Sequence, residues 1–136
     1  MYHSVLTREC YPDGPDSNRV KNLEATIVRL AQFFNIVDAE KLREQSGKRY
    51  LEFLRIPALS AGVYVLPAGS TDLQSPHQQD ELYYVVRGRA RMRAGSEDHA
   101  VSQGSVIFVA AGAEHRFYEI TDELMVLVFF APAESQ

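Results

Sequence analysis

The sequence predicts an all-β fold, a small antiparallel β-barrel that is preceded by helices. Its 136 residues suit one domain built around a single hydrophobic core. From Tyr50 onward, short apolar runs alternate with glycine, proline and polar turns, which is typical of a sandwich or barrel. Before Tyr50, apolar residues recur at helical spacing. We therefore expect one structural domain, with an N-terminal arm and helical segment at residues 1–49 and a β-barrel at residues 50–136.

Two helices are expected ahead of the barrel. The first carries an apolar stripe at steps of three and four residues, formed by Val20, Leu23, Ile27, Leu30 and Phe34. The second runs from Asp38 through Gln45, with Asp38 as its N-cap and Gly47 near its end. Amphipathic helices of this kind bury one face, so we expect both to cover a sheet.

Eight short strands are expected in the barrel, two of them ended by turns at Gly88 and at residues 121–123. A further hairpin tip is expected at residues 94–98. The last run, residues 124–130, is apolar on both faces and predicts a central strand. The expected strands are residues 50–56, 62–66, 82–86, 89–94, 99–101, 106–109, 116–120 and 124–130.

The composition argues against a nucleic-acid or membrane partner. The net charge is -4, and the closest approach to a basic patch is Arg89, Arg91 and Arg93, which alternate with apolar residues as on a solvated strand face. Cys10 is the single cysteine, so no intramolecular disulfide can form, and a free thiol suits the cytoplasm. No apolar window is long enough for a membrane span, nor do the first residues resemble a secretory leader. We expect a soluble cytoplasmic protein.

The first chemically suggestive stretch lies directly before the strand at residues 82–86. His77 and Glu81 are four residues apart, and in an extended chain they share a face with Ser75, Gln79 and Tyr83. An imidazole and a carboxylate would then point into the same space. Taken alone, the stretch equally suits an exposed pair at a strand entrance.

A second stretch repeats this design at residues 104–119. A buried-looking strand turns through a loop of small residues and places His115 at the entrance of the next strand. Two neutral imidazoles and one carboxylate suit a divalent transition metal, and such a set leaves coordination positions open. His77, Glu81 and His115 are therefore the candidate metal ligands.

Together the two stretches resemble the paired motifs of the cupin superfamily. The residues that match the first motif are Gly69, His77, Glu81 and Gly88, and Ser75 stands where its first histidine would be. Gly104, Gly112 and His115 match the second motif, in which Ala110 replaces a proline and Glu119 an asparagine. Fifteen residues separate Gly88 from Gly104, as in small single-domain microbial cupins. The resemblance covers residues 69–119 and implies a cupin, or RmlC-like, jelly roll.

The resemblance also implies a bound divalent metal, of which Fe, Mn, Ni, Co, Cu and Zn are all candidates. Because Ser75 is a poor ligand, three outcomes remain open: a three-ligand site completed by water, a site in which Ser75 or Gln79 holds a metal-bound water, or an empty pocket whose histidines bond to Glu81. Tyr83 and Glu119 are candidate catalytic acids or bases by face parity.

Three classes of function remain open. They are a metal-dependent enzyme acting on a small polar molecule, dioxygenase-like or isomerase-like; a non-catalytic cupin that binds or senses a small molecule; and a cupin with a structural metal. A structural site usually keeps no open position, which favours the first two. The apolar stripe of the first helix further suggests a homodimer.

Overall fold

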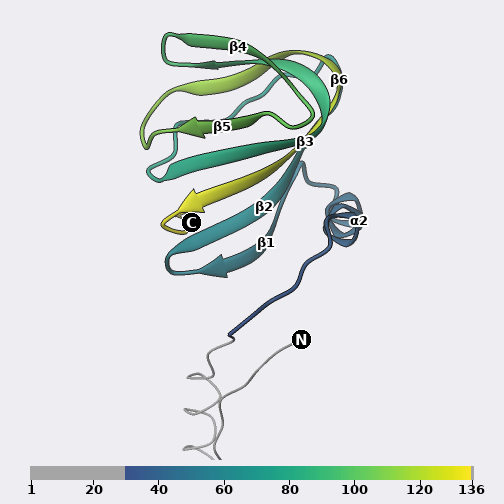
Figure 1. The fold of residues 1–136 in the computed structure, drawn as a ribbon. Coiled ribbons are helices and arrows are strands. Elements are labelled where there is room, and N and C mark those ends of the chain that lie inside the picture. Colours follow the sequence, from purple (N-terminus) through teal and green to yellow (C-terminus); the bar gives the residue numbers. More distant parts are fainter. Residues whose placement is uncertain (1–29, 136) are drawn as a thin grey trace, which may run out of the picture. The chain divides into compact units, whose positions relative to one another are not determined.

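The computed structural model describes residues 30–135, and the chain divides into two units between Phe34 and Asn35. Residues 30–34 of the first unit contain no helix or strand. The second unit contains one helix and six strands (Figure 1): α2 (Ile36–Ser46), β1 (Tyr50–Ile56), β2 (Leu59–Leu66), β3 (Asp80–Ala94), β4 (Glu97–Ser102), β5 (Val106–Val109) and β6 (His115–Ala131).

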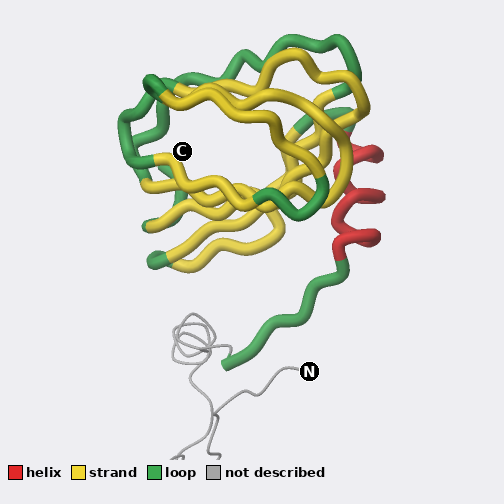
Figure 2. Tube along the Cα trace, turned by 45° about the horizontal axis from the view of Figure 1, so that its top comes forward, coloured by secondary structure: helices red, strands yellow, loops and turns green. Residues whose placement is uncertain are grey.

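All the strand pairs are antiparallel, and the strand order is β1-β2-β6-β3-β4, with β5 paired to β3. Figure 2 shows these strands curving around a common interior. The predicted all-β fold is confirmed. So is the central position of the last apolar run, because β6 pairs with β2 along one edge and with β3 along the other.

The number of strands was wrong, because two of the expected turns lie inside long strands. Gly88 adopts a φ of +99° within β3, where the register with β6 shifts, so it forms an irregularity in a continuous strand. Residues 121–123 likewise lie inside β6. The expected hairpin at residues 94–98 is confirmed, since β3 ends at Ala94 and β4 begins at Glu97.

The core follows the strand alternation. Tyr83, Val85 and Phe117 are at most 1% exposed and pack with other inward-facing side chains of β3 and β6. On the opposite face of β3, Arg91 and Arg93 both pair with Asp98. The hydrogen bond from the Tyr118 hydroxyl, together with these guanidinium groups, lowers the pKa of Asp98 to about 2. The expected solvated arginine face is confirmed.

Helix α2 covers part of the outer face of the sheet. Its buried residue Ala39 packs against a small cluster formed by Val63, Val65 and Met125. The helix begins earlier than expected, because the side chain of Asn35 accepts a hydrogen bond from Val37 N at 2.8 Å and serves as the N-cap in place of Asp38. Its expected end at Gly47, in the left-handed conformation, is confirmed.

An ion-pair network ties α2 to the sheet. The guanidinium group of Arg87 on β3 pairs with Glu40 of the helix and with Glu123 of β6. Its hydrogen bond to Glu40 lowers the pKa of that carboxyl group. The network links the helix to two adjacent strands.

The other expected helix lies largely outside the described residues, where Val20, Leu23 and Ile27 fall. Leu30 and Phe34 are described, and both are exposed and non-helical. Within residues 30–135, no helix combines the length and the apolar character that crossing a membrane demands.

Candidate metal centre

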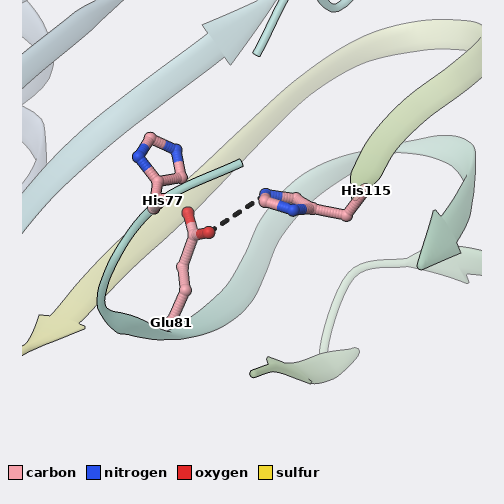
Figure 3. Close-up of side chains that lie close together, drawn as sticks. All are labelled: His77, Glu81 and His115. Atoms are coloured by element: carbon pink, nitrogen blue, oxygen red, sulfur yellow. Dashed lines mark ion pairs between the residues drawn. The ribbon is translucent and has the colours of Figure 1, made fainter. Parts of the chain in front are cut away.

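The fold brings His77, Glu81 and His115 together. One ligand atom of each lies within 4.8 Å of the others, and Figure 3 shows the Glu81 carboxylate between the two imidazoles. Glu81 and His115 are 2% and 8% exposed, and His77 is half-buried. The three side chains come from the loop before β3, the start of β3 and the start of β6.

Curvature of the sheet makes this convergence possible. His115 is the register partner of Ala94, at the opposite end of β3 from Glu81. A flat sheet would hold the two side chains a full strand length apart. A hydrogen bond of 2.7 Å from Gly112 N to His77 O also joins the loop that carries His77 to the loop that leads into His115.

The surroundings of His115 fix which ring nitrogen faces the site. Nδ1 lies 2.8 Å from the carbonyl oxygen of Ala113, so Nδ1 carries the proton that is donated there. Nε2 then faces Glu81 Oε2 at 3.0 Å and the hydroxyl of Tyr83 at 3.0 Å. Burial lowers the pKa of His115, but the Glu81 carboxylate and the Ala113 carbonyl outweigh it, so the net pKa is raised.

His77 is oriented in a similar way. Its Nδ1 lies 3.3 Å from Glu134 Oε1, which favours a proton on Nδ1 and leaves Nε2 as a lone-pair donor. The ring packs edge-on against Phe130, with the ring centroids 4.8 Å apart. Burial raises the pKa of Glu134, the largest effect on that group, although the nearby His77 opposes it.

Hydrogen bonding alone leaves this cluster unsatisfied. Both carboxylate oxygens of Glu81 are buried, and neither forms a well-aligned hydrogen bond in the part of the chain that the structure describes, although His115 Nε2 lies 3.0 Å from Oε2. With its proton on Nδ1, His115 also presents an Nε2 lone pair to this carboxylate at 3.0 Å, and a ring nitrogen of His77 lies within 4.8 Å of both. Hydrogen-bond acceptors that are buried close together cost folding free energy unless a cation lies between them. The residues therefore fit a divalent metal.

Of the other predicted site residues, only Tyr83 contacts the cluster. Its hydroxyl lies 3.0 Å from His115 Nε2, and burial raises its pKa well above the usual value. Ser75 is exposed. Gln79 is buried, and its amide donates to Ser135 Oγ at 2.6 Å. Glu119 is exposed at a φ of +46°, because an irregularity in β6 interrupts the alternation that would have turned it inward.

Three polar residues beside the site were missed from the sequence: Asp72, Gln74 and Glu134. All three lie outside the strands, in irregular segments that long-range contacts hold against the site. The inward and outward alternation of strand side chains therefore could not identify them. Gln74 directly precedes Ser75, the position that the motif spacing singled out. Its Oε1 lies 3.0 Å from the Tyr83 hydroxyl and 3.5 Å from His77 Nε2.

A cavity of about 460 Å³ opens beside His77. Its walls are mostly aromatic or aliphatic, and the hydroxyl of Tyr50 is buried there without a hydrogen-bond partner among the described residues. Polar groups enter from Arg49, Gln74 and Glu134. A small molecule with an apolar body and a few polar groups fits such a pocket.

Comparison with known proteins places these observations in a family. A family model described as the cupin domain matches residues 62–131. An uncharacterized protein of Streptomyces coelicolor is 47% identical over 102 residues, which cover 75% of this chain and 97% of that protein.

Solved structures show the same fold at low identity. The TT1209 protein from Thermus thermophilus superposes with a TM-score of 0.61 at 21% identity, over 76% of this chain and 99% of that one. KdgF from Halomonas sp. superposes with a TM-score of 0.56 at 20% identity, over 61% of this chain and 76% of that one. The DMSP lyase DddQ from Ruegeria pomeroyi DSS-3 superposes with a TM-score of 0.55 at 21% identity, over 64% of this chain and 49% of that one.

Proposed function

The chain belongs to the cupin family, and we propose that it binds one divalent transition metal and acts as a metal-dependent enzyme on a small polar molecule. The observation that carries this proposal is the buried Glu81 carboxylate, which forms no well-aligned hydrogen bond among the described residues, lies 3.0 Å from His115 Nε2 and groups within 4.8 Å with a ring nitrogen of His77. A cation held by His77, Glu81 and His115 would satisfy all three groups at once.

The three ligands are compatible with Fe, Mn, Ni, Co, Cu or Zn. Once bound, such an ion supplies Lewis acidity, and a redox-active one also supplies electron transfer. Three protein ligands leave coordination positions open, as catalytic sites require. The cavity beside His77 would give a small molecule access to the site, and we propose Tyr83, whose hydroxyl lies 3.0 Å from His115 Nε2, as the acid or base.

The reaction remains our proposal, dioxygenase-like or isomerase-like, because one cupin fold hosts many chemistries. One solved neighbour is named a lyase, which supports catalysis on this scaffold. The alternative is a non-catalytic cupin that binds or senses a small molecule, and the apolar walls of the cavity suit that role equally well. A turnover screen of the metal-loaded protein against ketoacids, catechols and sugars distinguishes the two.

Replacing Glu81 by glutamine tests the metal directly. The substitution keeps the shape of the side chain and removes the only negative charge among the three ligands, so we expect metal affinity to fall at least 100-fold. The untagged protein is loaded with Fe, Mn, Ni or Zn, dialysed and analysed for bound metal. One ion per chain is expected for the parent and for the control Glu119→Gln, which alters an exposed carboxylate. A parent that holds no metal after loading contradicts the proposal.

We also propose that two copies of the chain associate. Large apolar side chains lie exposed on the outer face of β3 and β5, where Leu82 pairs with Phe108 and Tyr84 with Val106, and each is 39% to 62% exposed. A symmetric contact would cover such a face. Sedimentation should give the mass of a dimer at micromolar concentration, and a monomer there contradicts this proposal.

The remaining partners follow from composition. We propose a cytoplasmic protein with a small-molecule ligand and no nucleic-acid or membrane partner, because the chain is acidic overall and has a single cysteine.

A further inference from the structure

We propose that Gln74 supplies a fourth ligand atom to the metal, its carbonyl oxygen Oε1, and that Asp72 fixes the orientation of the Gln74 amide. The inference rests on the proposed metal site. The motif spacing places the first ligand at Ser75, and we assign that ligand role to Gln74, the residue before it.

The orientation of the Gln74 amide follows from its neighbour. An ionised carboxylate only accepts hydrogen bonds, and Asp72 Oδ2 lies 2.8 Å from one terminal atom of Gln74. That atom must therefore be the nitrogen, Nε2. The other terminal atom is the oxygen, and it faces the Tyr83 hydroxyl at 3.0 Å and His77 Nε2 at 3.5 Å.

The position of Asp72 is itself fixed by two strands. Asp72 is 6% exposed, and its carboxylate accepts hydrogen bonds from the hydroxyl of Tyr64 on β2 and from Phe117 N on β6, both at 2.9 Å. A carboxylate held in this way has little freedom to rotate. Asp72 is thus a positioning residue for Gln74.

Gln74 Oε1 extends the set of converging acceptors. The Tyr83 hydroxyl donates to one of its lone pairs and lies 3.0 Å from His115 Nε2. The second lone pair of a carbonyl oxygen stays available. It faces His77 Nε2, whose own proton is favoured on Nδ1 by Glu134. With the His77 proton on Nδ1, the ring nitrogen and the carbonyl oxygen are both acceptors, and a cation between them would satisfy both.

A ligand set of two imidazole nitrogens and two oxygens has a chemical consequence. Amide and carboxylate oxygens are harder ligands than imidazole, and thus suit Fe²⁺ or Mn²⁺ better than Cu(I). Replacing a third imidazole by a neutral oxygen leaves the charge of the site unchanged. The chain therefore needs no histidine at position 75.

Gln74→Leu, which removes Oε1, tests the assignment, and Gln79→Leu is the matched control because Gln79 is a buried amide bonded to Ser135 instead. Affinity for Zn²⁺ is measured by competition with a chelator, and the visible absorption of the Co²⁺-loaded protein reports the number of ligands. We expect Gln74→Leu to weaken Zn²⁺ binding about 10- to 100-fold and to change the Co²⁺ spectrum. Asp72→Asn, whose amide no longer dictates the Gln74 orientation, should change the same spectrum.

The outcomes separate this inference from the function on which it rests. If the parent binds Zn²⁺ and Gln74→Leu binds it equally well with an unchanged Co²⁺ spectrum, Gln74 is not a ligand and the three-residue site stands. Equal losses in Gln74→Leu and Gln79→Leu also overturn the assignment. If the parent binds neither ion, the proposed function fails as well. Should Gln74→Leu not fold, Gln74→Ala, which also adds no ligand atom, gives the same comparison.

Discussion

Replacing Gly88 by alanine is expected to destabilise the barrel by about 3 kcal/mol or more. The residue has a φ of +99°, where a side chain is strained. An added Cβ would also overlap the carbonyl oxygen of Glu123 and lie 2.7 Å from Leu124 Cα. Both of these are backbone atoms of β6, so no side chain can rotate to relieve the clash, and the two longest strands would have to separate.

Reversible denaturation in urea measures this effect. The control is Gly95→Ala, since Gly95 has a φ of +58° but nothing within 4 Å of its added Cβ. That variant carries the backbone strain alone and should cost about 1 kcal/mol. Equal losses of stability in the two variants would show that the close approach to β6 is not the cause.

Gly88 also shows where the sequence misleads about the fold. A glycine between two apolar runs has the same local signature whether it ends a strand or forms an irregularity within one. The difference lies in β6, which continues past Gly88 as a partner although it is distant in the sequence. The expected turn at residues 121–123 fails for the same reason, because these residues lie opposite the irregular part of β3.

The same distinction explains which site residues could be predicted. Glu81 and Tyr83 lie inside β3, where alternation holds, and both are buried as expected. Ser75 lies ahead of β3, which begins at Asp80, so alternation does not apply there and Gln74 contacts the site instead. Glu119 does not face the site, because an irregularity in β6 turns its side chain outward. Asp72 and Glu134 depend on contacts with residues far away in the sequence, which no local pattern encodes.

Replacing His115 by alanine is expected to abolish stoichiometric metal binding, as is replacing His77. Each imidazole supplies a ligand that no neighbouring side chain can replace, because His115 comes from β6 and His77 from the loop before β3. Loss of either imidazole ligand should lower the affinity by several orders of magnitude. Ser75→Ala is the control and should retain the metal, because Ser75 is exposed. Elemental analysis after dialysis compares all the variants.

Acid should release the metal from the parent protein in a window set by His115. The pKa of His115 is lowered by burial but raised further by Glu81 and Ala113, so it lies above the ordinary 6.5. In the metal-free protein the ion pair with Glu81 therefore contributes stability that is fully present below pH about 6.5 and is lost as the pH rises through the raised pKa.

A metal ion must displace this same proton, so the apparent affinity should rise with pH across the same window. Chelator competition between about pH 5 and 8, a range set by the titration of histidine, measures the slope. An affinity that is independent of pH in the parent, or metal retained in full by both histidine variants, means that the ion binds elsewhere. The cluster would then be a hydrogen-bonded pocket, with a protonated His115 held against Glu81 in place of the cation.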